Sequence, residues 1–334
     1  MRVVKSVPVE EIVCRGSIKE SDVARFMKAF AEDPLIVEEE AEALFALNKA
    51  CAIQAPAWST FFVDAMAEHF INHSEPEGYV TAPKAQWLIS RISNDGWIGS
   101  RAELDLLLAI LGRSRWVPLS LATFALDQVK GAVRHGCGPL RAGQASRPGM
   151  MFEQDVALIR KILLAFGSDT SLAVTRAEAE ILLEINAVVT WATAPLSWSD
   201  LFIKAIANVI LASQGYAVPA RSLALARDRD LAASSHFEEM VTSSLAWVRR
   251  EYPRPSSQEA ALAKLERQRI EIVTQEPFYS REDASWVEQR FLSSGLSNGS
   301  GHGAEAHIVD YLRREGLIAE QSPLYAPVAG GRAA

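Results

Sequence analysis

The sequence has few cysteines, no excess of basic residues and no long apolar run, and each absence excludes a class of protein. Cys14, Cys51 and Cys137 are an odd number without a Cys-x-x-Cys pair, which favours a reducing cytoplasm over a disulfide framework. The net charge of −7 supplies no basic field for nucleic acid or an anionic membrane. No stretch approaches the roughly 20 apolar residues that span a bilayer. We therefore expect a cytoplasmic protein with no membrane span and no nucleic-acid partner.

What the sequence does contain is helical periodicity. Hydrophobic residues make up 49% of the 334 residues and charged residues 22%, which is typical of a globular protein with two domains or one duplicated domain. Leu104, Leu107, Leu108 and Leu111 fall at i, i+3, i+4 and i+7, on one helical face. No alternation of β-branched and polar residues reaches strand length. We therefore predict an all-α fold of about twelve helices without a sizeable sheet.

The chain repeats itself, because segments of its first half recur in the same order in its second half at similar displacements. Such self-similarity is typical of a tandem duplication of a multi-helix module. The matching pairs are SDVARFMKAF from Ser21 with QDVALIRKIL from Gln154, EAEALFALNKA from Glu40 with EAEILLEINAV from Glu178, PAWSTFFVDAMAEHFI from Pro56 with LSWSDLFIKAIANVIL from Leu196, and EGYV from Glu77 with QGYAV from Gln214.

The repeats define a predicted domain organisation. Residues 1–135 form the first helical repeat, and residues 151–320 form the second. The stretch 136–150 is rich in Gly and Pro and has no apolar period, so it predicts the linker between the repeats. The second copy is the longer one, which places an inserted helix near 221–255. The Pro-, Gly- and Ala-rich residues 321–334 are expected to form a flexible tail.

The stretch SNDGWIGSRAELDLLLAIL, residues 93–111, is similar to a calcium loop that leads into a helix. An EF-hand loop needs carboxylates at positions 1 and 12 and glycine at position 6. Aligning Gly96 with position 6 places Arg91 at position 1 and Ala102 at position 12. Because a cation stands where the first carboxylate belongs, we expect no complete EF-hand here.

Helix N-terminal capping boxes give these joints a structural interpretation. In a capping box, a hydroxyl and a carboxylate three residues apart each accept a hydrogen bond from a backbone amide of the first turn. The pairs with this spacing are Ser100 with Glu103, Thr175 with Glu178, and Ser280 with Asp283.

The motif NDGWIGSRAELDLL resembles the helical TerB-like family linked to tellurite resistance, and bacterial proteins built of such tandem helical modules. The resemblance covers short joints, about a fifth of the chain. It implies an all-helical fold, metal binding through acidic residues and a role in stress-response assemblies. Of the acidic positions, Asp95 and Glu103 match the pattern, whereas the other joints lack the Asp-Gly pair.

A second candidate metal site lies at His69 and His73, whose i, i+4 spacing is used by helical zinc sites. The stretch EHFINHSE lacks the His-Glu-x-x-His order, and the second copy has Val209 and Ser213 at these positions. A helix end that carries two histidines is therefore the structural alternative. The candidate metal ligands are Asp95, Glu103, His69 and His73.

Three functional hypotheses follow. The first is a non-catalytic interaction or regulatory protein, related to stress if the resemblance holds, because repeats with diverged turn chemistry are what selection on shape and surface leaves. The second is a divalent-metal sensor that uses the degenerate acidic joints. The third is an enzyme whose site is assembled from scattered residues. No nucleophile motif identifies catalytic residues, and no phosphate loop or dinucleotide motif indicates a cofactor.

A homodimer is expected because the inserted segment is more apolar than one small module needs. The first copy has no segment that matches 221–252, so we expect the surplus apolar surface to have no counterpart within the chain to pack against and to form the dimer contact. Filling of the seam between the repeats is the alternative. The residues concerned are Leu223, Leu225, Leu231, Phe237, Met240, Val241, Leu245, Trp247 and Val248.

Overall fold

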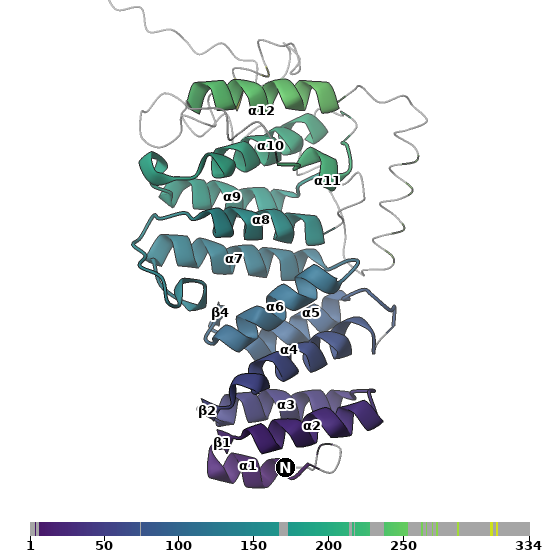
Figure 1. Ribbon diagram of the computed structural model, residues 1–334. Coiled ribbons are helices and arrows are strands. Elements are labelled where there is room, and N and C mark those ends of the chain that lie inside the picture. Colours follow the sequence, from purple (N-terminus) through teal and green to yellow (C-terminus); the bar gives the residue numbers. More distant parts are fainter. Residues whose placement is uncertain are drawn as a thin grey trace, which may run out of the picture. The chain divides into compact units, whose positions relative to one another are not determined.

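The computed structural model describes residues 4, 7–73, 75–166, 173–213, 216, 218–227 and 237–252, together with Leu262, Leu265, Arg269, Ile272, Trp286, Ile308, Val309 and Leu312. Twelve α-helices dominate these residues, and the only strands among them are two pairs of two-residue strands (Figure 1). The predicted all-α fold of about twelve helices without a sizeable sheet is therefore confirmed.

The chain divides into two compact units. Unit 1 is Met1–Ala125 with Gly138–Gly143, and unit 2 is Leu126–Cys137 with Gln144–Ala334. The division falls inside helix α7, Leu119–His135, ahead of the predicted linker. Unit 1 contains α1 Val9–Arg15, α2 Glu20–Glu32, α3 Glu38–Ala50, α4 Pro56–Ile71, α5 Ala82–Ile92, α6 Arg101–Arg113 and the 3₁₀ turn Pro139–Arg141. Unit 2 contains α8 Glu153–Ala165, α9 Arg176–Val188, the 3₁₀ turn Trp191–Thr193, α10 Leu196–Ser213, α11 Arg221–Ala224 and α12 Phe237–Glu251.

The four short strands tie helices of unit 1 together. β1 (Ser17–Ile18) precedes α2 and pairs in parallel with β2 (Ile53–Gln54), which precedes α4. β3 (Ser93–Asn94) and β4 (Trp97–Ile98) form an antiparallel hairpin. Both turn residues of that hairpin have positive φ, 52° at Asp95 and 84° at Gly96. Asp-Gly is a preferred pair for such a turn, which explains the motif without a metal.

Helix α4 forms the centre of unit 1. It begins at Pro56, which suits the first helical position because its missing N–H would have no partner there. Trp58, Phe62, Met66 and Phe70 follow at intervals of four residues and are buried. This face packs among α2, α3 and α6. The opposite, more polar face of α4 forms the site described below.

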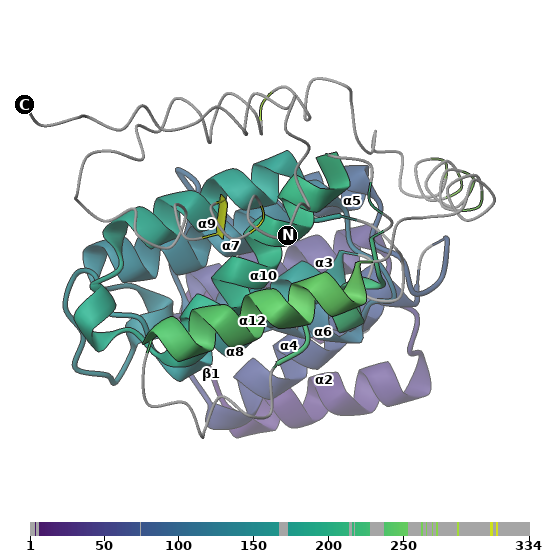
Figure 2. The same ribbon diagram turned by 90° about the horizontal axis from the view of Figure 1, so that it is seen from above.

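Helix α10 holds the corresponding place in unit 2. It contacts α8, α9, α11 and α12, and Figure 2 shows α12 lying along it. Every residue from Ser197 to Leu211 is buried. α10 is the only helix among the described residues that is long and apolar enough to cross a bilayer, and 83% of that window is buried in the molecule. Such burial fits the core helix of a soluble protein.

Several local features agree between the repeated segments. Trp58 and Trp198 are both fully buried, and each stacks or tilts against a phenylalanine four residues along, Phe62 or Phe202. The two helices α2 and α8 begin alike: the carboxylates of Asp22 and Asp155 accept the backbone N–H three residues earlier, each at 2.9 Å. These agreements support the duplication, which we retain as an inference.

The predicted capping boxes are present at two of the three joints. Ser100 Oγ accepts the backbone N–H of Glu103 at 3.2 Å, and Glu103 Oε2 accepts from Ser100 in return. Thr175 and Glu178 form the same pair at the start of α9. Ser280 and Asp283 lie outside the described residues.

Candidate functional site: a groove between α2 and α4

The predicted histidine pair holds a loop. His69 Nδ1 donates to the carbonyl oxygen of Ile36 at 2.8 Å, and His73 Nδ1 accepts the backbone N–H of Ile36 at 3.2 Å. Both polar groups of one buried residue are thus bound by the end of α4, which fixes the connection between α2 and α3. These Nδ1 atoms are used for structure, so a metal could reach only the other ring nitrogens.

This arrangement predicts an acid-sensitive unit 1. Burial, and then the neighbouring His73 and Lys84, lower the pKa of His69 below its ordinary 6.5. The unfolded chain then takes up this proton before the folded chain does. The contribution of His69 to stability is therefore complete above pH 6.5 and is lost as the pH falls below it. We expect the unfolding midpoint of wild type to drop more between neutral and mildly acidic pH than that of His69→Asn. Equal pH slopes in thermal melts of the two proteins would refute this assignment.

The predicted acidic pair lies elsewhere in unit 1. Asp95 is exposed in the β3–β4 turn, whereas the Glu103 carboxylate accepts from the hydroxyl of Ser100 at 2.8 Å at the start of α6. Within the ranges that the structure describes, no three side chains of His, Cys, Asp or Glu gather as metal ligands. The predicted ligands thus lie in two separate places. His69 and His73 both bind the backbone of Ile36, and Glu103 binds Ser100.

A groove of about 640 Å³ opens between α2 and α4. Its apolar surface comes from the outer face of α2, from the loop after it and from every fourth residue of α4. Polar side chains stand along one edge. The lining residues are Met27, Phe30, Ala31, Pro34 and Ile36, then Ala57, Thr60, Phe61, Asp64, Ala65 and Glu68, and finally Arg113 of α6.

Aromatic packing makes the floor of the groove rigid. The ring of Phe61 stacks on Phe26 with centroids 5.7 Å apart and meets Phe30 edge-on at 5.5 Å. Met27 stands at the edge with 57% of its surface exposed. Methionine adapts its shape to a ligand at small cost, so a rigid floor with a methionine edge suits an apolar ligand.

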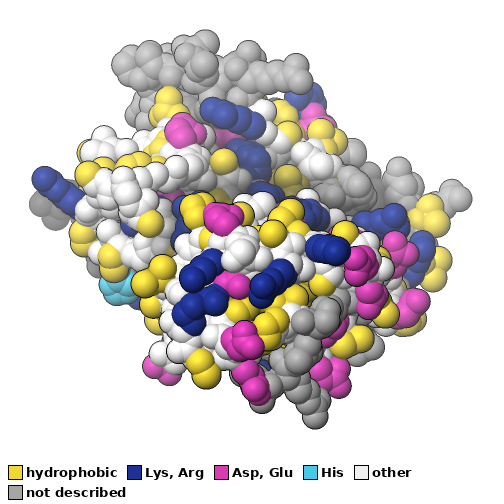
Figure 3. All heavy atoms as spheres, turned by 60° about the horizontal axis from the view of Figure 1, so that its bottom comes forward, with side chains coloured by type: hydrophobic (Ala, Val, Ile, Leu, Met, Phe, Trp, Pro, Cys, Tyr) yellow, Lys and Arg dark blue, Asp and Glu magenta, His cyan; other side chains and the backbone are white. Residues whose placement is uncertain are grey.

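The edge of the groove is acidic and partly neutralised. Arg113 Nη2 binds Asp64 Oδ1 at 2.6 Å, and the amide of Asn72 donates to Glu68 Oε1 at 2.7 Å. Among the described residues, Glu68 accepts a hydrogen bond from this neutral amide but forms no ion pair, so its negative charge is not neutralised. On the face drawn in Figure 3, Lys and Arg side chains lie among Asp, Glu and hydrophobic ones, so that face carries no field of one sign.

The matching face of α10 in unit 2 carries a row of polar residues, and α12 covers it. Repeat alignment pairs Thr60, Asp64 and Glu68 of the groove with Asp200, Lys204 and Asn208. Each of these three is fully buried and meets a residue of α12 or just beyond. Ser244 Oγ donates to Asp200 Oδ1 at 2.8 Å, Lys204 Nζ lies 4.6 Å from the centre of the Trp247 ring, and Asn208 Nδ2 donates to Tyr252 Oη at 2.6 Å.

This contact corrects one expectation about the inserted segment. Leu245 and Val248 are buried, and α12 packs on α10, so the segment does have a counterpart within its own chain. The expectation that it lacks one is wrong, because α12 fills the face of α10 that in unit 1 is open. The side chains of Leu231, Phe237, Met240 and Val241 lie outside the described part.

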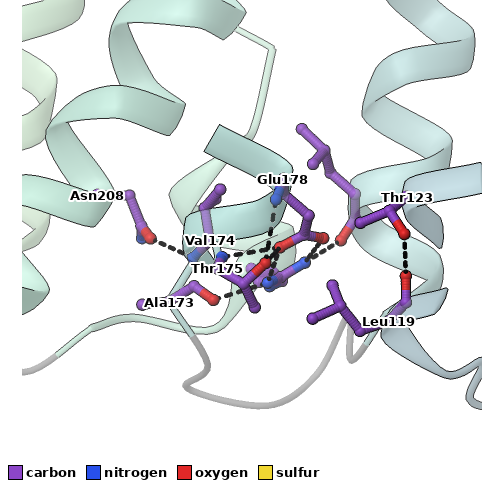
Figure 4. Close-up of polar contacts among 9 residues, drawn as sticks. Leu119, Thr123, Ala173, Val174, Thr175, Glu178 and Asn208 are labelled. Atoms are coloured by element: carbon purple, nitrogen blue, oxygen red, sulfur yellow. Dashed lines mark hydrogen bonds and ion pairs between the residues drawn. The ribbon is translucent and has the colours of Figure 1, made fainter. Parts of the chain in front are cut away.

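A buried ion pair anchors the beginning of the same segment. Arg221 donates to both carboxylate oxygens of Glu178, at 2.8 and 2.7 Å, and to the carbonyl oxygens of Leu163 and Ala173. Both side chains are fully buried. Figure 4 shows Glu178 and Thr175 together with Ala173 in this cluster. Because every charged group has partners within the fold, the pair is structural.

Sequence reasoning identified neither the groove nor the two buried charge clusters. A signal for one of them was present: Asp200, Lys204 and Asn208 follow at intervals of four in an otherwise apolar helix. Such a row indicates a buried partner, since charges are seldom fully buried without one.

No family model matches the chain, and comparison with curated proteins and with solved structures gives no match either.

Proposed function

We propose that this protein is a non-catalytic interaction protein that binds an amphipathic helix in the groove between α2 and α4. One observation carries the proposal. No helix among the described residues covers the face of α4 that lines the groove, whereas α12 covers the matching face of α10. Under the proposed duplication, α12 on α10 is an example of a helix seated at the matching place, and helix-in-groove binding is a common mode of recognition.

The chemistry of the groove favours binding over catalysis. The residues described at its lining include no Ser, Cys, His or Lys side chain, and the carboxylates of Asp64 and Glu68 are engaged by Arg113 and Asn72. General acid–base or nucleophilic catalysis needs such groups poised on a reacting atom. The enzyme hypothesis therefore has less support than binding. The metal-sensor hypothesis also has less support, because the histidine pair and Glu103 already hold backbone and hydroxyl groups.

A cytoplasmic location and a regulatory, stress-related role belong to the same proposal. Cys14 and Cys137 are exposed and free, and Cys51 is buried and free, which suits a reducing compartment. The stress-related role rests on the TerB-like resemblance at Asp95 and Glu103 alone.

Selection of peptides tests the proposed function. A display library of helical peptides is selected on immobilised wild type and on the variant Ala65→Glu. The variant adds a bulky side chain to the apolar floor and a third negative charge beside Asp64 and Glu68. Wild type is expected to enrich peptides with apolar residues at i, i+3 and i+7. These peptides should lose binding to Ala65→Glu.

Ala46→Glu is the matched control, because Ala46 is exposed on α3 and lies outside the groove lining. Its binding should equal that of wild type, with thermal melts confirming that both variants are folded. Absence of enrichment on wild type, or equal binding by Ala65→Glu, would overturn the proposal.

A further inference from the structure

Unit 2 carries an exposed apolar stripe that its own core does not use. Leu262, Leu265 and Ile272 are helical, with 61%, 63% and 79% of their surfaces exposed. Their spacing of three and seven residues places them on one side of a helix. Arg269, also helical and exposed, falls on the same side between Leu265 and Ile272. The stripe, defined as Leu262, Leu265, Arg269 and Ile272, therefore combines apolar contacts with one central positive charge.

The groove of unit 1 offers the complementary chemistry. Its floor is apolar around Phe61 and Ala65, and its edge carries the Glu68 carboxylate on the same helix. We expect a helix whose Leu262 and Leu265 lie on this floor to bring Arg269 to the edge that carries Glu68. Arginine forms strong, directional hydrogen bonds with carboxylates. Opposite charges at the edge select the partner and its register more than they add affinity.

We propose that a second copy of this chain occupies the groove, so that the stripe of each copy binds between α2 and α4 of the other. This inference rests on the proposed function, which it makes specific by naming the partner. Among the described residues, no side chain of unit 1 fills the groove, and the apolar side chains of the stripe are exposed on unit 2. In a dimer with this reciprocal contact, the stripe of each copy covers the groove of the other, so both grooves and both stripes are buried and no further copy can add. The predicted homodimer is thereby moved from 221–252 to a different pair of surfaces.

A charge-swap experiment on the full-length chain tests the exchange. Wild type is expected to be a dimer in sedimentation equilibrium. Glu68→Arg places two arginines at each contact, and Arg269→Glu places two glutamates there. Each variant alone should self-associate more than about tenfold more weakly, because like charges facing each other cost several kcal/mol.

Mixing the two variants should restore a dimer, because each groove then meets a stripe of opposite charge. The double variant Glu68→Arg with Arg269→Glu should also dimerise alone. Glu42→Arg, on the exposed face of α3, is the charge-reversal control. It removes an exposed ion pair with Arg91, which contributes little to stability, and should leave the dimer unchanged. Leu265→Glu should give a monomer that no charge swap rescues.

The outcomes separate this inference from the proposed function. A monomeric wild type, or a mixture that stays monomeric, overturns the exchange between copies. If a synthetic peptide of residues 258–274 still binds that monomer and loses binding in Ala65→Glu, the groove remains a helix-binding site. If neither the peptide nor any library peptide binds, the proposed function fails as well.

Discussion

Replacing Arg221 with methionine is expected to lower the free energy of unfolding of unit 2 by about 3–5 kcal/mol. The substitution leaves the fully buried carboxylate of Glu178 without its cation, in a site from which water is excluded. The carbonyl oxygens of Leu163 and Ala173 lose their donors at the same time. Leaving one partner of a buried pair uncompensated costs more than the pair itself contributes. Urea titration followed by circular dichroism, with amide exchange of α9, measures the loss.

The double variant Glu178→Met with Arg221→Met should recover part of this loss, since neither charge remains buried. Recovery stays incomplete because the two carbonyl groups lose the arginine donor, and the backbone N–H and hydroxyl of Thr175 lose the carboxylate that accepts from them. Arg101→Met is the matched control, because Arg101 forms an exposed i, i+4 pair with Asp105. Exposed pairs contribute little. If Arg221→Met were no more destabilising than Arg101→Met, the pair would not be the anchor that its burial indicates.

Replacing Lys204 with methionine is expected to cost a similar amount, about 3–5 kcal/mol, and to loosen α12 in particular. Lys204 Nζ binds Asp200 Oδ1 at 2.8 Å and the carbonyl oxygen of Ala226 at 2.8 Å. Without it, the buried Asp200 retains the hydroxyl of Ser244, with Arg160 Nη2 at 3.8 Å. The ring of Trp247 also loses the cation beneath it. Faster amide hydrogen exchange across α12 in Lys204→Met would show that the contact between α12 and α10 is weakened.

Lys28→Met provides the control for Lys204, because Lys28 forms an exposed i, i+4 pair with Glu32. It should change neither the unfolding midpoint nor the exchange of α12. The variant Asp200→Asn with Lys204→Met removes both charges and should regain much of the lost stability. A large loss of stability without faster exchange in α12 would mean that Lys204 holds the core of α10 and not its contact with α12.

Some features of this protein followed from the sequence by itself. The all-α class was predictable because apolar residues recur with helical period, as along Leu104 to Leu111. The capping boxes at Ser100 and Thr175 were predictable because they involve groups only three residues apart. The expectation that no complete EF-hand loop surrounds Gly96 also rests on local spacing and stays a prediction.

Only the tertiary structure decided whether the polar faces of α4 and α10 are covered by another helix. α4 and α10 have matching sequences, yet one lines an open groove and the other is buried under α12. The pairing of Glu178 with Arg221 joins residues far apart in the chain, as does the binding of Ile36 by His69 and His73. Periodicity reports which side of a helix is apolar, but not which distant segment covers it, because that depends on long-range packing. The candidate site lies where such a covering helix is absent from unit 1 as the structure describes it.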